Sequence, residues 1–188
     1  MSENKIIDFW FNQECIPRNW FVKDAAFDAS IEKNFGDLLR TYTGAQNVIV
    51  PAEPKKQLAL ILLFDQFSRN LYRNSPQAFA FDVLALQIAQ KGVADGSDKM
   101  LSPQQRAFFY MPFEHSEDLA VQNQSVVLFK ALSEEFPSDT MLKSFYDYAV
   151  RHRNIIEKFG RYPHRNAVLN RQSTPEELAF LTQPGSSF

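Results

Sequence analysis

The stretch LALILLFDQFSRN, residues 58–70, decides the fold class of this chain. Its first seven residues are all apolar, so a helix formed there must be buried on every side. Asp65 follows at once and Arg69 comes four residues later, which places both side chains on one helix face. The sequence therefore predicts a buried helix over 54–71 that carries a partly desolvated ion pair. A structural pair and a functional one remain open alternatives.

Signals for the start of a helix recur along the chain. Ser-Pro or Thr-Pro pairs, which place a cap before a first-turn proline, occur at 75–76, 102–103 and 174–175. There are only six glycines, and no Asn-Gly or Asp-Gly turn joins alternating runs, which argues against an all-β protein. Short connections favour antiparallel neighbours, and 188 residues suit one domain over 1–188, with 183–188 as a loose tail. We expect an all-α fold of about eight helices, at 3–12, 24–42, 54–71, 76–91, 103–111, 116–135, 138–159 and 174–182.

Composition excludes several classes of protein. A net charge of −2 argues against a nucleic-acid scaffold or a polybasic membrane binder. One cysteine, Cys15, cannot build a disulfide framework or a cysteine-based metal cluster. The longest apolar run is far too short to cross a bilayer, and no secretory signal is visible, so we expect a cytoplasmic protein.

Positive charge gathers near the C-terminus. Residues 151–171 hold six Lys or Arg side chains against Glu157 alone, a local balance of +5. One interpretation is a basic surface that pairs internally with acidic helices. The other is a pocket for an anionic ligand, because arginine donates a planar two-pronged fork to carboxylates.

Three further places break the apolar pattern. In the helix over 138–159, His152 takes a position where an aliphatic residue belongs, either as a satisfied core histidine or as a titrating group in a cleft. In PFEHSED, Pro112 is predicted to end one helix and Ser116 to start the next, so Glu114 and His115 lie at a tight corner. The loop FGRYPHRN, residues 159–166, follows the end of that helix. It has the composition of a recognition loop, with the donor-rich side chains Arg161, His164, Arg165 and Asn166.

At these segments the sequence closely resembles a bacterial family known as domain of unknown function 924. The resemblance covers nearly the whole chain and is carried by 58–82, 110–129 and 152–177, with IIDFWF and WFVKDAAFD nearer the N-terminus. Ser68 stands where the family pattern often has proline. The resemblance implies an all-helical fold similar to tetratricopeptide-repeat arrays, and it implies no activity.

Several functions fit these residues. We expect first a binding module that takes a small anionic metabolite or a peptide carboxylate. The alternatives are an acid–base or metal-assisted hydrolase using Asp65, Glu114 and His115, His152 or His164, and a purely structural network. No cofactor, metal, membrane or nucleic acid is expected, and a homodimer stays open. We predict that Asp65, Arg69, His115 and His164 converge on one cleft, and the full candidate ligand-binding set is Asp65, Arg69, Asn70, Arg73, Glu114, His115, His152, Arg161, His164, Arg165 and Asn166.

Overall fold

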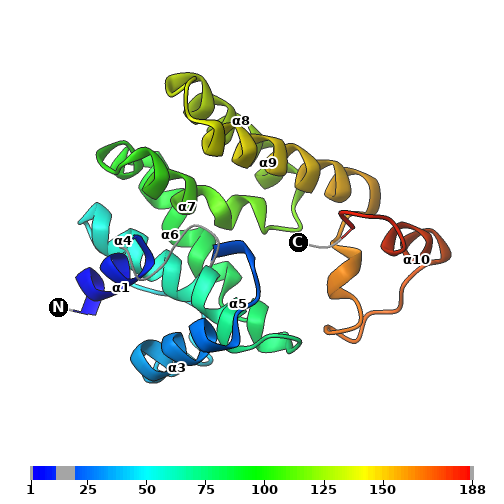
Figure 1. Ribbon diagram of the computed structural model, residues 1–188, viewed down its shortest axis with the longest axis horizontal. Coiled ribbons are helices and arrows are strands. Elements are labelled where there is room, and N and C mark those ends of the chain that lie inside the picture. Colours follow the sequence, from blue (N-terminus) through cyan, green and yellow to red (C-terminus); the bar gives the residue numbers. More distant parts are fainter. Residues whose placement is uncertain (1, 12–19, 187–188) are drawn as a thin grey trace. The chain divides into compact units, whose positions relative to one another are not determined.

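The computed structural model describes residues 2–11 and 20–186, and Cys15 lies outside them. The described residues form helices and no strand, so the predicted all-α class is confirmed (Figure 1). The tetratricopeptide-like arrangement stays a prediction. No helix in the described part of the chain combines the length and the apolar character needed to span a bilayer.

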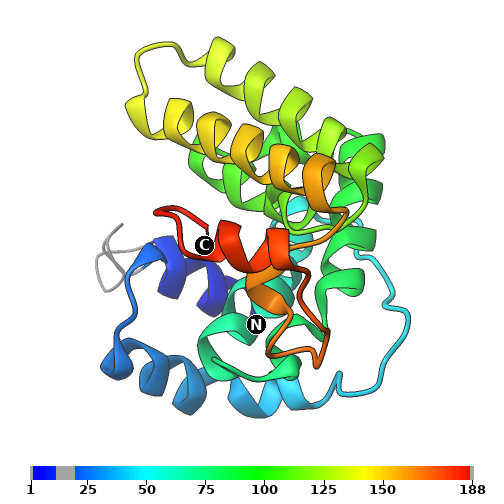
Figure 2. The same cartoon turned by 90° about the vertical axis from the view of Figure 1, so that its right-hand side faces the viewer.

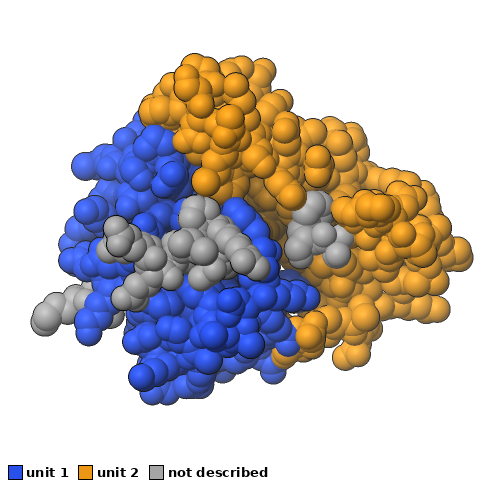
Figure 3. All heavy atoms as spheres, viewed as in Figure 1, with its two compact units in different colours: residues 1–73, 77–112 blue, residues 74–76, 113–188 orange. Residues whose placement is uncertain are grey.

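The chain divides into two compact units. Unit 1 comprises 1–73 and 77–112, and unit 2 comprises 74–76 and 113–188 (Figure 3). Each unit is described below by itself. The prediction of one domain over 1–188 remains a prediction.

Unit 1 packs its helices around a continuous buried one. Residues 54–71 are helical throughout, as the apolar run predicts, and all residues from Leu58 to Phe64 except the half-buried Leu60 are fully buried. Aromatic rings fill the surrounding core, where the ring centroid of Trp10 lies 5.5 Å from those of both Phe67 and Phe108. The elements of unit 1 are α1 (Ser2–Phe11), α3 (Ala25–Arg40), α4 (Pro54–Ile61), η1 (Leu62–Phe67), α5 (Ser68–Leu71), η2 (Pro76–Phe79, whose first residue belongs to unit 2), α6 (Asp82–Ala94), η3 (Ser97–Met100) and α7 (Pro103–Glu114, whose last two residues belong to unit 2).

The middle of the buried helix is a π-helix. Over η1 (Leu62–Phe67) the backbone widens, and every residue of this segment is buried, including Asp65. Short π segments inside α-helices are frequent at functional sites. The apolar pattern predicts the helix, but it contains no signal for this local widening.

Unit 2 is built on a helical hairpin. Helices α8 (Leu119–Glu135) and α9 (Thr140–Phe159) lie side by side in both views (Figures 1 and 2). The chain then passes through η4 (Pro163–Arg165) to α10 (Pro175–Leu181), which packs near η4. Ile155, Ile156 and Tyr162 form a buried apolar cluster there. The predicted caps at Ser102 and Thr174 are both present, each with reciprocal bonds to the side chain three residues on.

Four predicted helix ends, on three helices, are wrong. Helix α6 begins at Asp82 rather than at residue 76, and it runs past Gly92 to Ala94. A Cβ on Gly92 would lie 2.4 Å from both Gln57 Oε1 and Phe109 Cζ, so this glycine permits close helix packing and is no helix end. Helix α7 continues through Pro112 to Glu114, because a proline in the last turn removes only one hydrogen bond. Helix α8 starts at Leu119, capped by Asp118 rather than Ser116.

Candidate functional site

The centre of the candidate site is a buried carboxylate–imidazole pair in unit 2. Glu114 Oε1, at the end of α7, lies 2.9 Å from Nδ1 of His152 on α9. Their residues are 5 % and 4 % exposed. The apolar stripe of α9, which includes Ala149 and Ile156, carries the imidazole into the interior, as the sequence predicts.

The contacts of this pair favour one tautomer of the imidazole. Nδ1 of His152 also lies 2.9 Å from the carbonyl oxygen of Tyr148, one turn earlier on α9. Both neighbours accept hydrogen bonds, so Nδ1 carries the proton and donates it. In the neutral ring, Nε2 then bears the basic lone pair. This is the arrangement in which a carboxylate orients a histidine for proton transfer.

The three histidines of the chain and Tyr162 form a series of neighbouring rings. The His152 ring centroid lies 6.2 Å from that of His115 and 5.6 Å from that of Tyr162. The ring centroid of His164 lies 5.5 Å from that of Tyr162, on the end of the series opposite to His115. His115 and His164 are partly exposed, so the cluster reaches the surface at both. We call these four residues with Glu114 the histidine cluster.

The end of the cluster at His164 is electropositive. Burial, and after it the charges of Arg165 and His152, together lower the pKa of His164 to about 3. The Arg165 guanidinium is buried and lies 4.5 Å from the centroid of the Tyr162 ring. His164 is therefore neutral at pH 7 and acts as a hydrogen-bonding group rather than as a cation.

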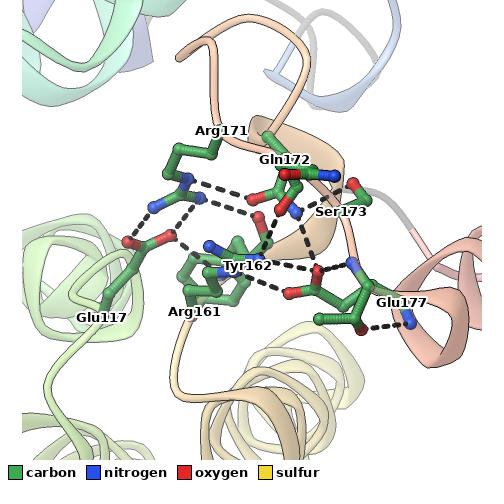
Figure 4. Close-up of polar contacts among 9 residues, drawn as sticks. Glu117, Arg161, Tyr162, Arg171, Gln172, Ser173 and Glu177 are labelled. Atoms are coloured by element: carbon green, nitrogen blue, oxygen red, sulfur yellow. Dashed lines mark hydrogen bonds and ion pairs between the residues drawn. The ribbon is translucent and has the colours of Figure 1, made fainter.

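A clamp holds the loop that carries Tyr162 and His164 (Figure 4). Arg171 donates to both carboxylate oxygens of Glu117, at 2.6 and 2.9 Å, and to the carbonyl oxygen of Tyr162. The backbone N–H of Tyr162 donates to Glu117 as well. Burial raises the pKa of Glu117, but the bonds from Arg171 and Tyr162 outweigh it and hold that pKa below its usual value. Both Tyr162, near the start of the loop, and Arg171, near its end, are thereby bonded to Glu117, which lies just before α8.

A second clamp engages two of the predicted loop residues. Arg161 donates to both oxygens of Glu177, at 2.6 and 2.8 Å, and Asn166 donates to Glu177 and to Ser173 (Figure 4). The bond from Arg161 lowers the pKa of Glu177 to about 2. Within unit 2, Arg161 and Asn166 thus hold the loop against α10. A ligand-binding role for these two residues stays an untested prediction.

Most of the positive segment is matched by nearby carboxylates. Besides the two clamps, Arg153 pairs with Glu157 and Lys158 with Glu176. These ion pairs agree with the first interpretation of the positive segment, a basic surface that pairs internally with carboxylates. Arg165 is buried, and its guanidinium lies over the ring of Tyr162, a member of the histidine cluster.

The remaining predicted site residues form two polar groups in unit 1. Arg69 Nη1 donates to the Asp65 carbonyl oxygen at 2.6 Å and lies 3.3 Å from its Oδ1, as the spacing predicts. Its stronger partner is Asp82, which accepts from both Nη atoms at 2.9 and 3.0 Å. Sequence spacing contained no signal for Asp82, because it approaches from another helix.

Asn70 and Arg73 meet Asp28 of α3. Asn70 Nδ2 donates to Oδ1 at 2.8 Å, and Arg73 donates to both oxygens at 2.6 and 2.9 Å. Burial raises the pKa of Asp28, and the bonds from Arg73 and Asn70 bring it below its ordinary value. The predicted residues therefore divide between the units, with four in unit 1 and seven in unit 2. Their convergence on one cleft stays a prediction.

Sequence reasoning missed Tyr162, which belongs to the histidine cluster, and Gln122, which binds to it. Gln122 donates to the carbonyl oxygens of Glu114 and Ser116 and to the Tyr162 hydroxyl, which itself donates to Glu114 O. Gln122 interrupts the apolar face of its helix as His152 does, and that signal could have marked it. Over residues 2–11 and 20–186, no group of three His, Cys, Asp or Glu side chains is placed to hold a metal ion.

Comparisons with known proteins agree on the family and are silent on function. A family model described as a bacterial protein of unknown function (DUF924) matches residues 6–185. The structure of a protein of unknown function, ATU0120 from Agrobacterium tumefaciens, is 36 % identical, with a TM-score of 0.81 over 95 % of this chain and 96 % of that one. No curated protein matches the sequence.

Proposed function

This chain belongs to DUF924, a family of bacterial proteins of unknown function, and we propose that unit 2 binds a small molecule and exchanges a proton with it through the Glu114–His152 pair. The observation that carries this proposal is the 2.9 Å contact between the two side chains at a site where both are buried. A buried pair of this kind often stabilises a fold no more than apolar residues of similar volume would. Its presence there favours a chemical role.

The roles of the cluster residues follow from their positions. Glu114 orients the His152 ring and stabilises the imidazolium that forms when Nε2 accepts a proton. His164, neutral at pH 7, is the second group able to donate or accept a hydrogen bond within the cluster. The two clamps hold the loop that positions Tyr162 and His164. This division of roles belongs to general acid–base chemistry, of which hydrolysis is one example.

The tautomer of His152 provides the first test. In the ¹⁵N-labelled full chain the three imidazoles are assigned from single His→Gln variants, and their tautomers are read from the ring nitrogen shifts above pH 7. We expect the proton of His152 on Nδ1 in the native protein. A proton found on Nε2 instead would remove the orienting role of Glu114.

Turnover provides the second test, with p-nitrophenyl acetate as a general probe of acid–base reactivity. We expect His152→Gln to lower the rate by about 10²-fold, a typical contribution of one general base, and Glu114→Gln to lower it in the same direction. The matched control is Glu157→Gln, an exposed carboxylate on the same helix, which should leave the rate unchanged. Equal rates in the native protein and His152→Gln would refute the proposal.

A second candidate function is the binding of an anion at the electropositive end. The buried Arg165 guanidinium against the Tyr162 ring favours it, because Arg can offer a two-pronged fork to a carboxylate. N-acetylglycine, a minimal peptide carboxylate, should then raise the melting temperature of the native protein but not that of Arg165→Gln. An equal rise in both would mean that the anion binds elsewhere.

A further inference from the structure

Three buried oxygen atoms of unit 2 are unmatched by any hydrogen-bond donor in the described part of the chain. They are Glu114 Oε2, Gln122 Oε1 and Ser125 Oγ. Their residues are 5 %, 0 % and 0 % exposed, so bulk water does not satisfy them. Buried polar atoms in folded proteins nearly always have a partner, and three of them in one unit require an explanation.

Two of the three residues are joined by a hydrogen bond. Gln122 Nε2 donates to the backbone carbonyl oxygen of Glu114 at 2.6 Å, which places the Gln122 side chain beside Glu114. Ser125 lies three residues further along α8, on the same helix face as Gln122. The orientation of the Gln122 amide is determined by its neighbours, because its Nε2 faces two carbonyl oxygens and the Tyr162 hydroxyl. Its Oε1 is therefore an acceptor.

The chemistry of the three atoms selects the group that they fit. Glu114 Oε2 and Gln122 Oε1 only accept hydrogen bonds, and the Ser125 hydroxyl can accept one. A carboxylate or phosphate would face the Glu114 charge and find only one donor among these groups, the Ser125 hydroxyl. A water molecule has two hydrogens, whereas a primary ammonium has three and a positive charge opposite to that of Glu114.

We propose that the ligand of unit 2 carries a primary ammonium group that donates to Glu114 Oε2, Gln122 Oε1 and Ser125 Oγ. The inference rests on the proposed function in one respect, since Glu114 uses its other oxygen to orient His152. It adds the substrate class: a primary amine, held beside the imidazole that exchanges the proton.

The test compares two cations of equal charge on the full chain. Methylammonium chloride has three N–H donors, and tetramethylammonium chloride has none. We expect methylammonium to shift the His152 ring resonances saturably and to raise the melting temperature, and tetramethylammonium to do neither at equal concentration. Glu114→Gln should abolish the methylammonium response, because it removes the charge and replaces an acceptor by a donor.

A milder substitution keeps the test informative if Glu114→Gln does not fold. Ser125→Ala removes one acceptor and should weaken methylammonium about five-fold, the effect of one ordinary hydrogen bond. Its matched control is Ser133→Ala on the same helix, whose hydroxyl donates to the Lys130 carbonyl oxygen, and that variant should bind as the native protein does. Equal responses to the two cations, no response to methylammonium, or equal binding by the two serine variants would each overturn the inference.

The two proposals fail separately. If methylammonium binds as predicted but His152→Gln keeps the full hydrolysis rate, the amine site stands and the proton-transfer function falls. If the rate is lost in His152→Gln while methylammonium gives no response, the function stands and the amine site is refuted. A crystal structure with only ordered water on the three oxygens, at saturating methylammonium, would also refute the amine site.

Discussion

Replacing His152 by leucine separates the two interpretations of the buried pair. The substitution suits the apolar stripe of α9, but it leaves the Glu114 carboxylate buried without the imidazole. Removing one partner of a buried pair costs about 3–5 kcal/mol, because the remaining charge is uncompensated. Leucine recovers part of this through apolar burial, so we expect a net loss of about 2–4 kcal/mol.

The double variant His152→Leu with Glu114→Met completes the experiment. It replaces both polar groups by apolar ones, and such replacements are often neutral or stabilising by about 1–4 kcal/mol. We therefore expect the double variant to be at least as stable as the native protein. That result would mean that the fold does not need the pair, which supports a chemical role for it.

The measurement is urea unfolding followed by two signals. Both tryptophans, Trp10 and Trp20, lie in unit 1, so their fluorescence reports that unit, whereas far-ultraviolet circular dichroism reports the helices of both. The free energy of unfolding follows from the midpoint and slope of each transition. A single variant as stable as the native protein, or a double variant as unstable as the single one, would refute the reasoning.

Three further predictions concern packing and pH. Gly92→Ala should destabilise unit 1 by about 1–2 kcal/mol in urea unfolding, because overpacking against Gln57 and Phe109 exceeds the gain of about 1 kcal/mol in helix propensity. Because the pKa of His164 is low in the folded protein, between pH 3 and 6.5 the unfolded chain binds a proton at this residue and the folded protein does not. Stability should therefore fall by roughly 1.4 kcal/mol per pH unit from pH 6.5 down to about 3, and His164→Gln should flatten that slope in unfolding curves measured across this range. The pKa of Glu117 is lowered because its charged form is held by hydrogen bonds in the folded protein. The stabilisation from these bonds is complete above the unfolded pKa of about 4.3 and is lost as the pH falls below it. Glu117→Gln should thus cost about 2 kcal/mol at pH 7, and the difference from the native protein should shrink steadily in melts as the pH falls below about 4.3.

The candidate site was only partly predictable from sequence. His152 and Glu114 could be singled out because each breaks a local rule, one as a polar residue on an apolar stripe and the other at a helix corner. The 2.9 Å contact between them could not be predicted, because it joins α7 and α9, which the whole of α8 separates in the sequence. For the same reason, Glu177 appears in the sequence only as a capping residue, although it also binds Arg161 sixteen positions away.

The sequence by itself determined the helical class, most of the helices and the caps at Ser102 and Thr174, because these depend on residues within a few positions of one another. Tertiary structure alone decided the π-helix around Asp65, the close packing at Gly92 and the partners of the arginines. These features depend on side chains brought together from different helices, and spacing along the chain carries no information about such contacts. The chemistry of a buried charge is set by those contacts, so the site could be proposed only once the fold had placed Glu114 against His152.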